Sequence, residues 1–196
     1  AILPMLGIGG MQLYRAESPG PVKDNKLLPR VTETAKALLF IYISLTMLCA
    51  IAYFLAGMPI FDAIGHSFAT VAIGGFSTHD ASIAYFDSSA IEVIAIIFML
   101  ISGVNFALHF FACQHKSPKH YFQDSEFRFY IAMLAVIGLI TVLFLFFSGI
   151  YNLQDSVFKG LFEVVSIATT TGFSSADFSV WPTFLPFLLF YMAFVG

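Results

Sequence analysis

Two short segments of the chain, 97 residues apart, end in the same Gly-Phe-Ser motif, at residues 75–77 and 172–174. Nothing around these motifs resembles a nucleophile paired with a base. The chemistry that they offer belongs to the main chain, because Gly75 and Gly172 can adopt positive φ and let successive carbonyl oxygens turn toward one axis. Stacked carbonyl oxygens can replace the water shell of a cation. The paired motifs therefore predict coordination of a dehydrated cation by backbone oxygen atoms.

The composition indicates that lipid is the main solvent of the elements that carry these motifs. Of the 196 residues, 59% are apolar and only 11% are charged, whereas soluble domains carry about 25% charged residues. The 24 phenylalanines exceed what a soluble surface tolerates. The chain does not begin with Met, and both of its ends fall inside apolar segments, so we expect a piece of a longer polytopic membrane protein.

Five apolar stretches are candidates for membrane spans, since a transmembrane helix needs about 20 predominantly apolar residues. Three stretches have this length, at residues 37–56, 93–113 and 129–149. Two further stretches, 1–11 and 181–196, are cut by the ends of the chain. We expect all five to be spanning helices.

Two other apolar stretches, residues 60–73 and 157–170, are too short to span. Each begins beside an aspartate suited to a helix N-terminus, contains one polar residue (His66 or Glu163), and leads into its Gly-Phe-Ser motif. The C-terminus of such a half-helix carries a partial negative charge, which favours a cation in front of it.

The basic residues decide the orientation of these short stretches. Eight of the nine Lys and Arg residues fall in two connections, residues 12–36 and 114–128, which the positive-inside rule places in the cytoplasm. The connections that hold the short stretches are acidic and carry only Lys159 among the basic residues. If a short stretch crossed the membrane, the second basic connection would lie on the opposite side. Both short stretches must therefore enter the membrane from outside and return.

The two half-helices belong to an internal repeat. A shift of 97 residues gives six identities over the 22 positions 61–82, clustered around the Gly-Phe-Ser motif, and places His66 on Glu163. A repeated unit of span, half-helix, loop and span is a signature of a pore or a transporter.

These loops, together with the basic connection and its Pro19-Gly20-Pro21 sequence, resemble the Trk/Ktr/HKT superfamily of potassium transporters, and within it the bacterial TrkH family. The resemblance covers essentially the whole chain. It implies an all-α polytopic membrane fold, in which four M1–P–M2 units (helix, half-helix with filter, helix) surround one pseudo-fourfold pore. On that template residues 1–11 are the end of an earlier M2, 12–36 a cytoplasmic linker, 37–113 a complete unit with its filter at 73–77, 114–128 a second cytoplasmic linker, and 129–196 a unit truncated within M2 with its filter at 169–174.

The resemblance also implies a function, which is potassium uptake across the bacterial cytoplasmic (inner) membrane by the pore-forming subunit of a Trk-type system. It implies no enzymatic activity, no organic cofactor and no nucleic acid partner. The implied partners are membrane lipid, a second copy of the subunit in a homodimer, and a cytosolic ring of TrkA-like nucleotide-binding regulatory subunits. The carbonyl oxygens that would hold potassium are those of Ile73, Gly74, Thr170 and Thr171, joined in the filter by those of Gly75 and Gly172.

A few polar residues in the apolar segments need partners. Glu163 is costly inside a half-helix if it is unpaired, so we expect it to accept hydrogen bonds from the backbone behind its filter. Asn105 and His109, at i and i+4, are predicted to share one helix face, either toward the pore cavity or in an interhelical hydrogen bond. The other residues expected to support the filters are Phe76, Ser77, Phe173 and Ser174.

Three alternative functions remain at this point. A coupled secondary transporter also uses broken helices, but most such folds have inverted repeats, whereas these two repeats have the same topology. A membrane enzyme would need convergent acids, bases or metal ligands in its spans. A sodium-selective or poorly selective relative remains open, because only two filters of four are visible in this sequence.

Overall fold

The structure, a computed structural model, describes residues 31–115 and 117–194. Every regular element in this part of the chain is a helix, as the sequence predicts. The predicted span at residues 1–11 and most of the first basic linker lie outside the described residues. In chain order the elements are α3 (Val31–Leu55), α4 (Ile60–Val71), η1 (Ser82–Phe86), α5 (Ser89–Ser102), α6 (Phe106–Gln114), α7 (Lys119–Gln123), α8 (Ser125–Phe147), α9 (Leu153–Ala168), η2 (Phe178–Val180) and α10 (Phe184–Met192).

Two of these helices are long and apolar enough to cross a membrane by themselves. They are α3, over Ala35–Leu55, and α8, over Ser125–Phe147. Large apolar side chains such as Phe40 and Phe129 remain exposed along them. Exposure of this kind is expected where lipid, rather than water, surrounds a helix.

The described ends of the two predicted cytoplasmic linkers are helical. α3 already begins within the linker 12–36, and the linker 114–128 contains α7 and the first turn of α8. The side chain of Asp124 starts α8 by accepting a hydrogen bond from the N–H of Phe127 at 2.8 Å. Charged residues are compatible with these helix ends because they lie where the helices leave the hydrocarbon.

The predicted span at residues 93–113 is not one continuous helix. Its two halves, α5 and α6, meet at an angle of 86°. Asn105 lies at the break and caps α6, because its side chain accepts a hydrogen bond from the N–H of Ala107 at 2.9 Å. The expectation that Asn105 shares a helix face with His109 is therefore wrong. The physical reason is that Gly103 is a poor helix former and Asn105 a good N-cap, so together they end one helix and start the next.

His109 does make the interhelical contact that was one of its two expected roles. Its Nδ1 lies 2.8 Å from the hydroxyl of Tyr121 in α7, and its Nε2 lies 2.9 Å from the carbonyl oxygen of Ile101, near the end of α5. The histidine thus links both sides of the break to the second cytoplasmic linker.

The last predicted span starts later than expected. Within the described residues only Phe184–Met192 form α10, which is too short to cross a membrane. The chain before it contains η2 and the extended residue Trp181, with φ −72° and ψ 158°. Pro182 explains this, because a proline disfavours helical backbone in the residue that precedes it.

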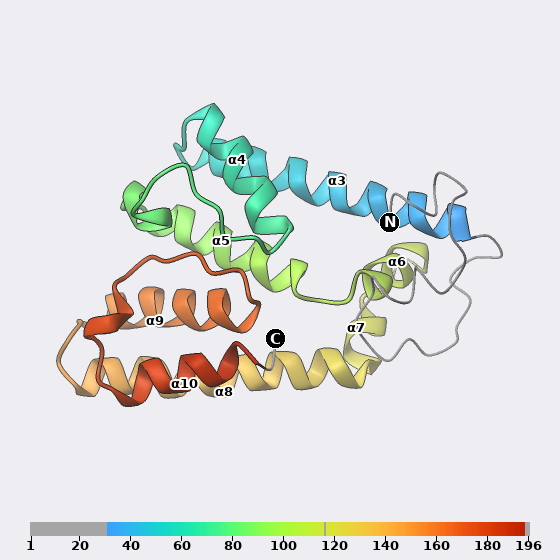
Figure 1. Cartoon of the computed structure of the whole chain (residues 1–196). Helices are drawn as coiled ribbons and strands as arrows, with labels where there is room; N and C mark the ends of the chain where they lie inside the picture. Colours follow the sequence, from blue (N-terminus) through green and yellow to red (C-terminus); the bar gives the residue numbers. More distant parts are fainter. Residues whose placement is uncertain (1–30, 116, 195–196) are drawn as a thin grey trace.

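The two short apolar stretches form the half-helices α4 and α9. Figure 1 shows that both run from the same end of the molecule part of the way along it, after which an extended loop returns to that end. They begin earlier than the aspartates suggested: α4 follows Pro59, and Asn152 caps α9 by accepting the N–H of Asp155 at 2.8 Å. Asp62 and Asp155 lie in the first turns.

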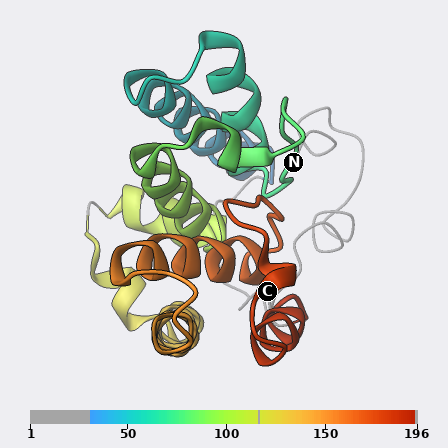
Figure 2. The same ribbon diagram turned by 90° about the vertical axis from the view of Figure 1, so that its left-hand side faces the viewer.

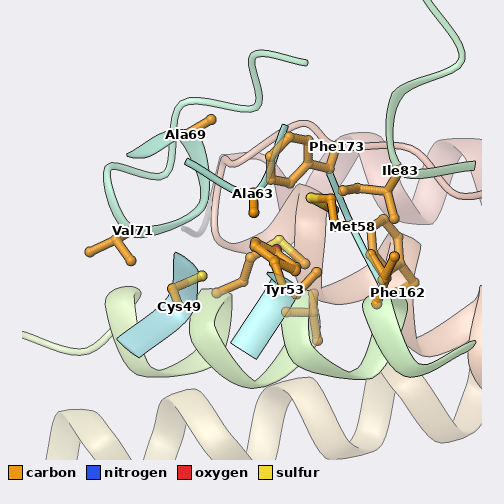
Figure 3. Close-up of a cluster of buried hydrophobic side chains, with 13 residues drawn as sticks. Cys49, Tyr53, Met58, Ala63, Ala69, Val71, Ile83, Phe162 and Phe173 are labelled. Atoms are coloured by element: carbon orange, nitrogen blue, oxygen red, sulfur yellow. The ribbon is translucent and has the colours of Figure 1, made fainter. Parts of the chain in front are cut away.

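The two units pack against each other through α5 and α9. α4 contacts α3 and α5, while α9 contacts α8, α10 and also α5 of the preceding unit. Viewed from the end, α5 lies between α4 and α9, with α8 and α10 beyond (Figure 2). Residues of both units share one apolar core, in which Phe162 and Phe173 of the second unit lie among Tyr53, Met58 and Ile83 of the first (Figure 3).

Candidate functional site

The two loops that follow the half-helices have the same backbone pattern. Ile73 and Gly75 have φ of 54° and 63°, and Thr170 and Gly172, at the equivalent repeat positions, have φ of 60° and 84°. The residue between each pair does not have positive φ. Alternating right- and left-handed residues align successive N–H groups on one edge of the chain, which leaves successive carbonyl oxygens on the other edge.

The N–H edge of each loop faces its own half-helix. The N–H of Ile73 donates to the carbonyl oxygen of Thr70 at 3.2 Å, and the equivalent Thr170 donates to Ile167 at 3.0 Å. The carbonyl oxygens on the opposite edge accept no hydrogen bond from any residue that the structure describes. Apart from Thr171, the residues that carry them are half-buried or exposed, so this run of free oxygens is accessible to a ligand. These oxygens belong to Ile73, Gly74, Gly75, Thr170, Thr171 and Gly172, the six residues that the sequence singled out.

The two loops touch each other at Gly75. A Cβ atom added to Gly75 would overlap the carbonyl oxygen of Thr171 and would lie 3.1 Å from the carbonyl carbon of Gly172. Gly75 is therefore required for a close approach as well as for its positive φ. Gly172 has open space where its Cβ would be, so only its φ of 84° requires glycine. The structure thus brings the two glycines of the repeated motif together.

Glu163 makes the backbone contacts that the sequence predicts. It is fully buried, and its Oε1 accepts the N–H groups of Ser175 at 2.7 Å and Ala176 at 3.1 Å. The hydroxyl of Ser174 donates to the carbonyl oxygen of Ala176 at 2.8 Å, and its oxygen lies 3.4 Å from the same Oε1. Ser166, which the sequence analysis did not single out, donates from its hydroxyl to the carbonyl oxygen of Phe173 at 2.6 Å. α9 therefore holds the loop just after its glycine from two successive turns.

His66 occupies the equivalent place in the first unit, also fully buried. Its Nδ1 lies 2.8 Å from the carbonyl oxygen of Asp62, which can only accept, so Nδ1 carries the proton. Its Nε2 then accepts from the hydroxyl of Ser77, 2.9 Å away. The hydroxyl oxygen of Ser77 in turn accepts the N–H of His79 at 3.1 Å. The sequence paired His66 with Glu163 but did not predict this contact.

Further contacts join the second loop to the first unit. The N–H of Ser174 donates to the hydroxyl of Ser82 at 3.2 Å, and its carbonyl oxygen accepts the N–H of Ala84 at 3.2 Å. Of the two predicted supporting phenylalanines, only Phe173 is buried, whereas Phe76 has 80% of its surface exposed. Within the described part of the chain, Phe76 therefore supports no packing around its filter.

The end of the molecule at which the half-helices begin keeps its negative charge. The hydroxyl of Thr78 donates to Asp62 at 2.6 Å and, with His79, lowers the pKa of that carboxyl group. Hydrogen bonds from the hydroxyl and the N–H of Ser179 lower the pKa of Asp177 in the second loop. Residues 31–115 and 117–194 bring no three acidic, histidine or cysteine side chains together as a metal site.

The whole chain, residues 1–196, matches the model of a family described as TrkH, cation transport protein. The chain belongs to the TrkH family. Among its relatives, the Trk system potassium uptake protein TrkH of Halomonas elongata is 61% identical over 196 residues, and that of Escherichia coli K12 is 55% identical over 197. The alignments cover 100% of this chain but 41% of each relative.

A solved TrkH-family structure agrees with the fold. The crystal structure of the potassium transporter TrkH from Vibrio parahaemolyticus matches with a TM-score of 0.81 and 49% identity, covering 98% of this chain and 38% of the other. The predicted all-α fold is confirmed by this match. The predicted location as a multi-pass protein of the bacterial inner membrane is confirmed by the family and by the spanning helices.

Proposed function

We propose that this chain supplies two filter-bearing units of a pore that takes up potassium across the bacterial inner membrane. The observation that supports the proposal is the pairing of the two loops. At equivalent repeat positions, each loop turns its N–H groups onto its half-helix and leaves a run of carbonyl oxygens free, and the two runs meet where Gly75 approaches Thr171. Carbonyl oxygens in such runs replace the water that a potassium ion loses on entering a filter.

The proposal gives each group a physical role. The C-termini of α4 and α9 add partial negative charge in front of the cation. Glu163 and the serines after the two glycines keep the loops in shape. Transport needs no organic cofactor and no chemical step. Potassium is bound by the carbonyl oxygens of Ile73, Gly74, Thr170 and Thr171, together with those of Gly75 and Gly172.

The complete pore needs more than this chain. The chain spans about two fifths of the length of the curated relatives it matches, and those relatives are named potassium uptake proteins. We propose four filter-bearing units around one axis, of which this chain contributes two. Lipid surrounds the spans, a second copy forms a homodimer, and a TrkA-like nucleotide-binding subunit binds on the cytoplasmic side.

A graft tests the proposal in a full-length transporter. Residues 1–196 replace the matching part of the Halomonas elongata relative, and the graft is purified into liposomes for flux measurements with potassium and with sodium. The expected result is potassium flux that exceeds sodium flux and that equals that of the unmodified relative within about threefold. A correctly inserted graft that carries no potassium, or that carries both ions equally, contradicts the proposal.

A further inference from the structure

His66 contacts both filter loops, although its hydrogen bond to Ser77 alone is enough to support its own loop. Its Nε2 accepts the hydroxyl of Ser77, the second residue after Gly75 of the first filter. Its ring also lies stacked on Phe173, which directly follows Gly172 of the second filter, with centroids 5.9 Å apart and planes 29° apart. The two contacts use different parts of the imidazole, one a ring nitrogen and the other the ring face.

The surroundings of His66 fix its ring in this position. The ring is fully buried, and Phe86 of η1 meets it edge-on at 5.3 Å between centroids. The Nδ1–H is held by the carbonyl oxygen of Asp62 at 2.8 Å. Both ring nitrogens are hydrogen-bonded, and aromatic rings pack against the imidazole. Rotation of the ring would break a hydrogen bond in an apolar site, so one orientation is strongly favoured.

His66 differs in this respect from Glu163, its counterpart in the repeat. Glu163 contacts residues 174–176 of its own loop. His66 contacts its own loop and the loop of the other unit. His66 is therefore a side chain of α4 that links the two carbonyl runs, beside the contacts of Gly75 with Thr171 and of Ser174 with Ser82.

We propose that His66 is a positioning residue shared by both filters, which sets the discrimination between potassium and sodium by fixing Ser77 and Phe173 relative to each other. This inference rests on the proposed function. Potassium and sodium differ in size, so a filter whose two carbonyl runs can shift apart loses part of its preference. His66 touches no ion, and its effect passes entirely through the two loops.

Two substitutions in the grafted transporter separate the two contacts of His66. His66→Phe keeps an aromatic ring against Phe173 but removes the acceptor for Ser77. His66→Gln keeps a polar group near the position of Nε2 but removes the ring. Each is expected to lower the potassium-to-sodium flux ratio, His66→Phe by about tenfold, because it leaves the hydroxyl of Ser77 without its acceptor, and His66→Gln by about threefold. His115→Gln, an exposed histidine at the end of α6, is the matched control and is expected to leave the ratio unchanged.

A double substitution shows whether the effect passes through Ser77. Ser77→Ala alone is expected to lower the ratio as much as His66→Phe, and the combination is expected to be no worse than either. Ser77→Ala also provides the test if the His66 variants do not reach the membrane. A merely structural role for His66 would lower the amount of folded protein and leave the flux ratio of the remainder unchanged.

The outcomes distinguish this inference from the function on which it rests. If Gly172→Ser lowers the flux ratio while His66→Phe, His66→Gln and Ser77→Ala do not, the role of His66 is overturned and the filter stands. If none of these four substitutions changes the ratio, the filter proposal itself fails.

Discussion

The two half-helices present the same backbone pattern with different supporting side chains. In the first unit a neutral imidazole accepts one hydroxyl group, from Ser77. In the second, a carboxylate oxygen of Glu163 accepts two N–H groups, those of Ser175 and Ala176. The left-handed residues nevertheless fall at identical repeat positions, 73 and 75 in one loop and 170 and 172 in the other. The repeat therefore preserves the path of the main chain. The acceptor that supports the loop differs between the units, an imidazole nitrogen in the first and a carboxylate oxygen in the second.

The two glycines share a positive φ but differ in packing, since a Cβ would be crowded at Gly75 and would meet open space at Gly172. Gly75→Ser is expected to reduce potassium transport by about a hundredfold, because the new Cβ overlaps the carbonyl oxygen of Thr171 and because the left-handed φ adds strain. Gly172→Ser meets open space and suffers only the strain, about 1–2 kcal/mol, so transport continues while the potassium-to-sodium ratio falls by about tenfold. Flux measurements on the graft check both, and equal losses at the two glycines would contradict the comparison.

Glu163 tests whether its unit needs an acceptor or a charge. Glu163→Ala leaves the N–H groups of Ser175 and Ala176 buried and unpaired, which is expected to lower the free energy of unfolding by about 2–5 kcal/mol. Glu163→Gln keeps the oxygen that accepts these hydrogen bonds. The amide nitrogen takes the place of Oε2, which has no partner among the described residues. We therefore expect the free energy of unfolding to fall by about 1 kcal/mol or less. Thermal unfolding of the purified graft measures both. A glutamine variant as unstable as the alanine variant would show that charge matters.

The serines at equivalent positions 82 and 179 distinguish a contact between units from one within a loop. The hydroxyl of Ser82 accepts from Ser174 across the units, whereas that of Ser179 donates to Asp177 in its own loop. Ser82→Ala is expected to lower the free energy of unfolding by about 1 kcal/mol, and Ser179→Ala by less than about half of that, because the second contact is exposed. Thermal unfolding of the two variants side by side is the measurement, and the reverse order would contradict the assignment.

Acid is expected to have the smallest effect, and to act through Asp62 in the first turn of α4 more than through Asp177 in the second loop. Hydrogen bonds hold the pKa values of Asp62 and Asp177 below their usual range. Each carboxylate therefore contributes stability above its unfolded pKa of about 3.9, and this contribution is lost as the pH falls through the lower, folded value. Asp62→Asn should flatten the fall in melting temperature below pH 4 more than Asp177→Asn, because Asp62 is also bonded to His79. Equal pH profiles would contradict this ranking.

The sequence was sufficient where a feature depends on length and charge alone. The half-length of α4 and α9 and the repeat of their loops follow from apolar lengths and residue spacing. The hydrogen bond of Glu163 was also predictable, because a buried carboxylate must find donors and its own loop supplies the nearest ones.

Features that depend on tertiary contact were missed. The break before α6 was not predicted, because apolar residues on both sides of Gly103 and Asn105 read as one span. Ile73 and Thr170 gave no sign of positive φ, since β-branched residues rarely adopt it and only the surrounding structure imposes it. The contact of His66 with Phe173 joins residues of different units, which no periodicity within one unit can reveal.

On the proposed function, the left-handed conformation of Ile73 and Thr170 makes the bound cation part of the folding equilibrium of the two loops. Each residue would gain about 1–2 kcal/mol by returning to negative φ. A ligand that binds only the strained form stabilises that form by an amount that grows with the logarithm of its concentration. Under the same proposal the transported ion is also a structural ligand, and its depletion is expected to loosen the carbonyl runs that its binding orders.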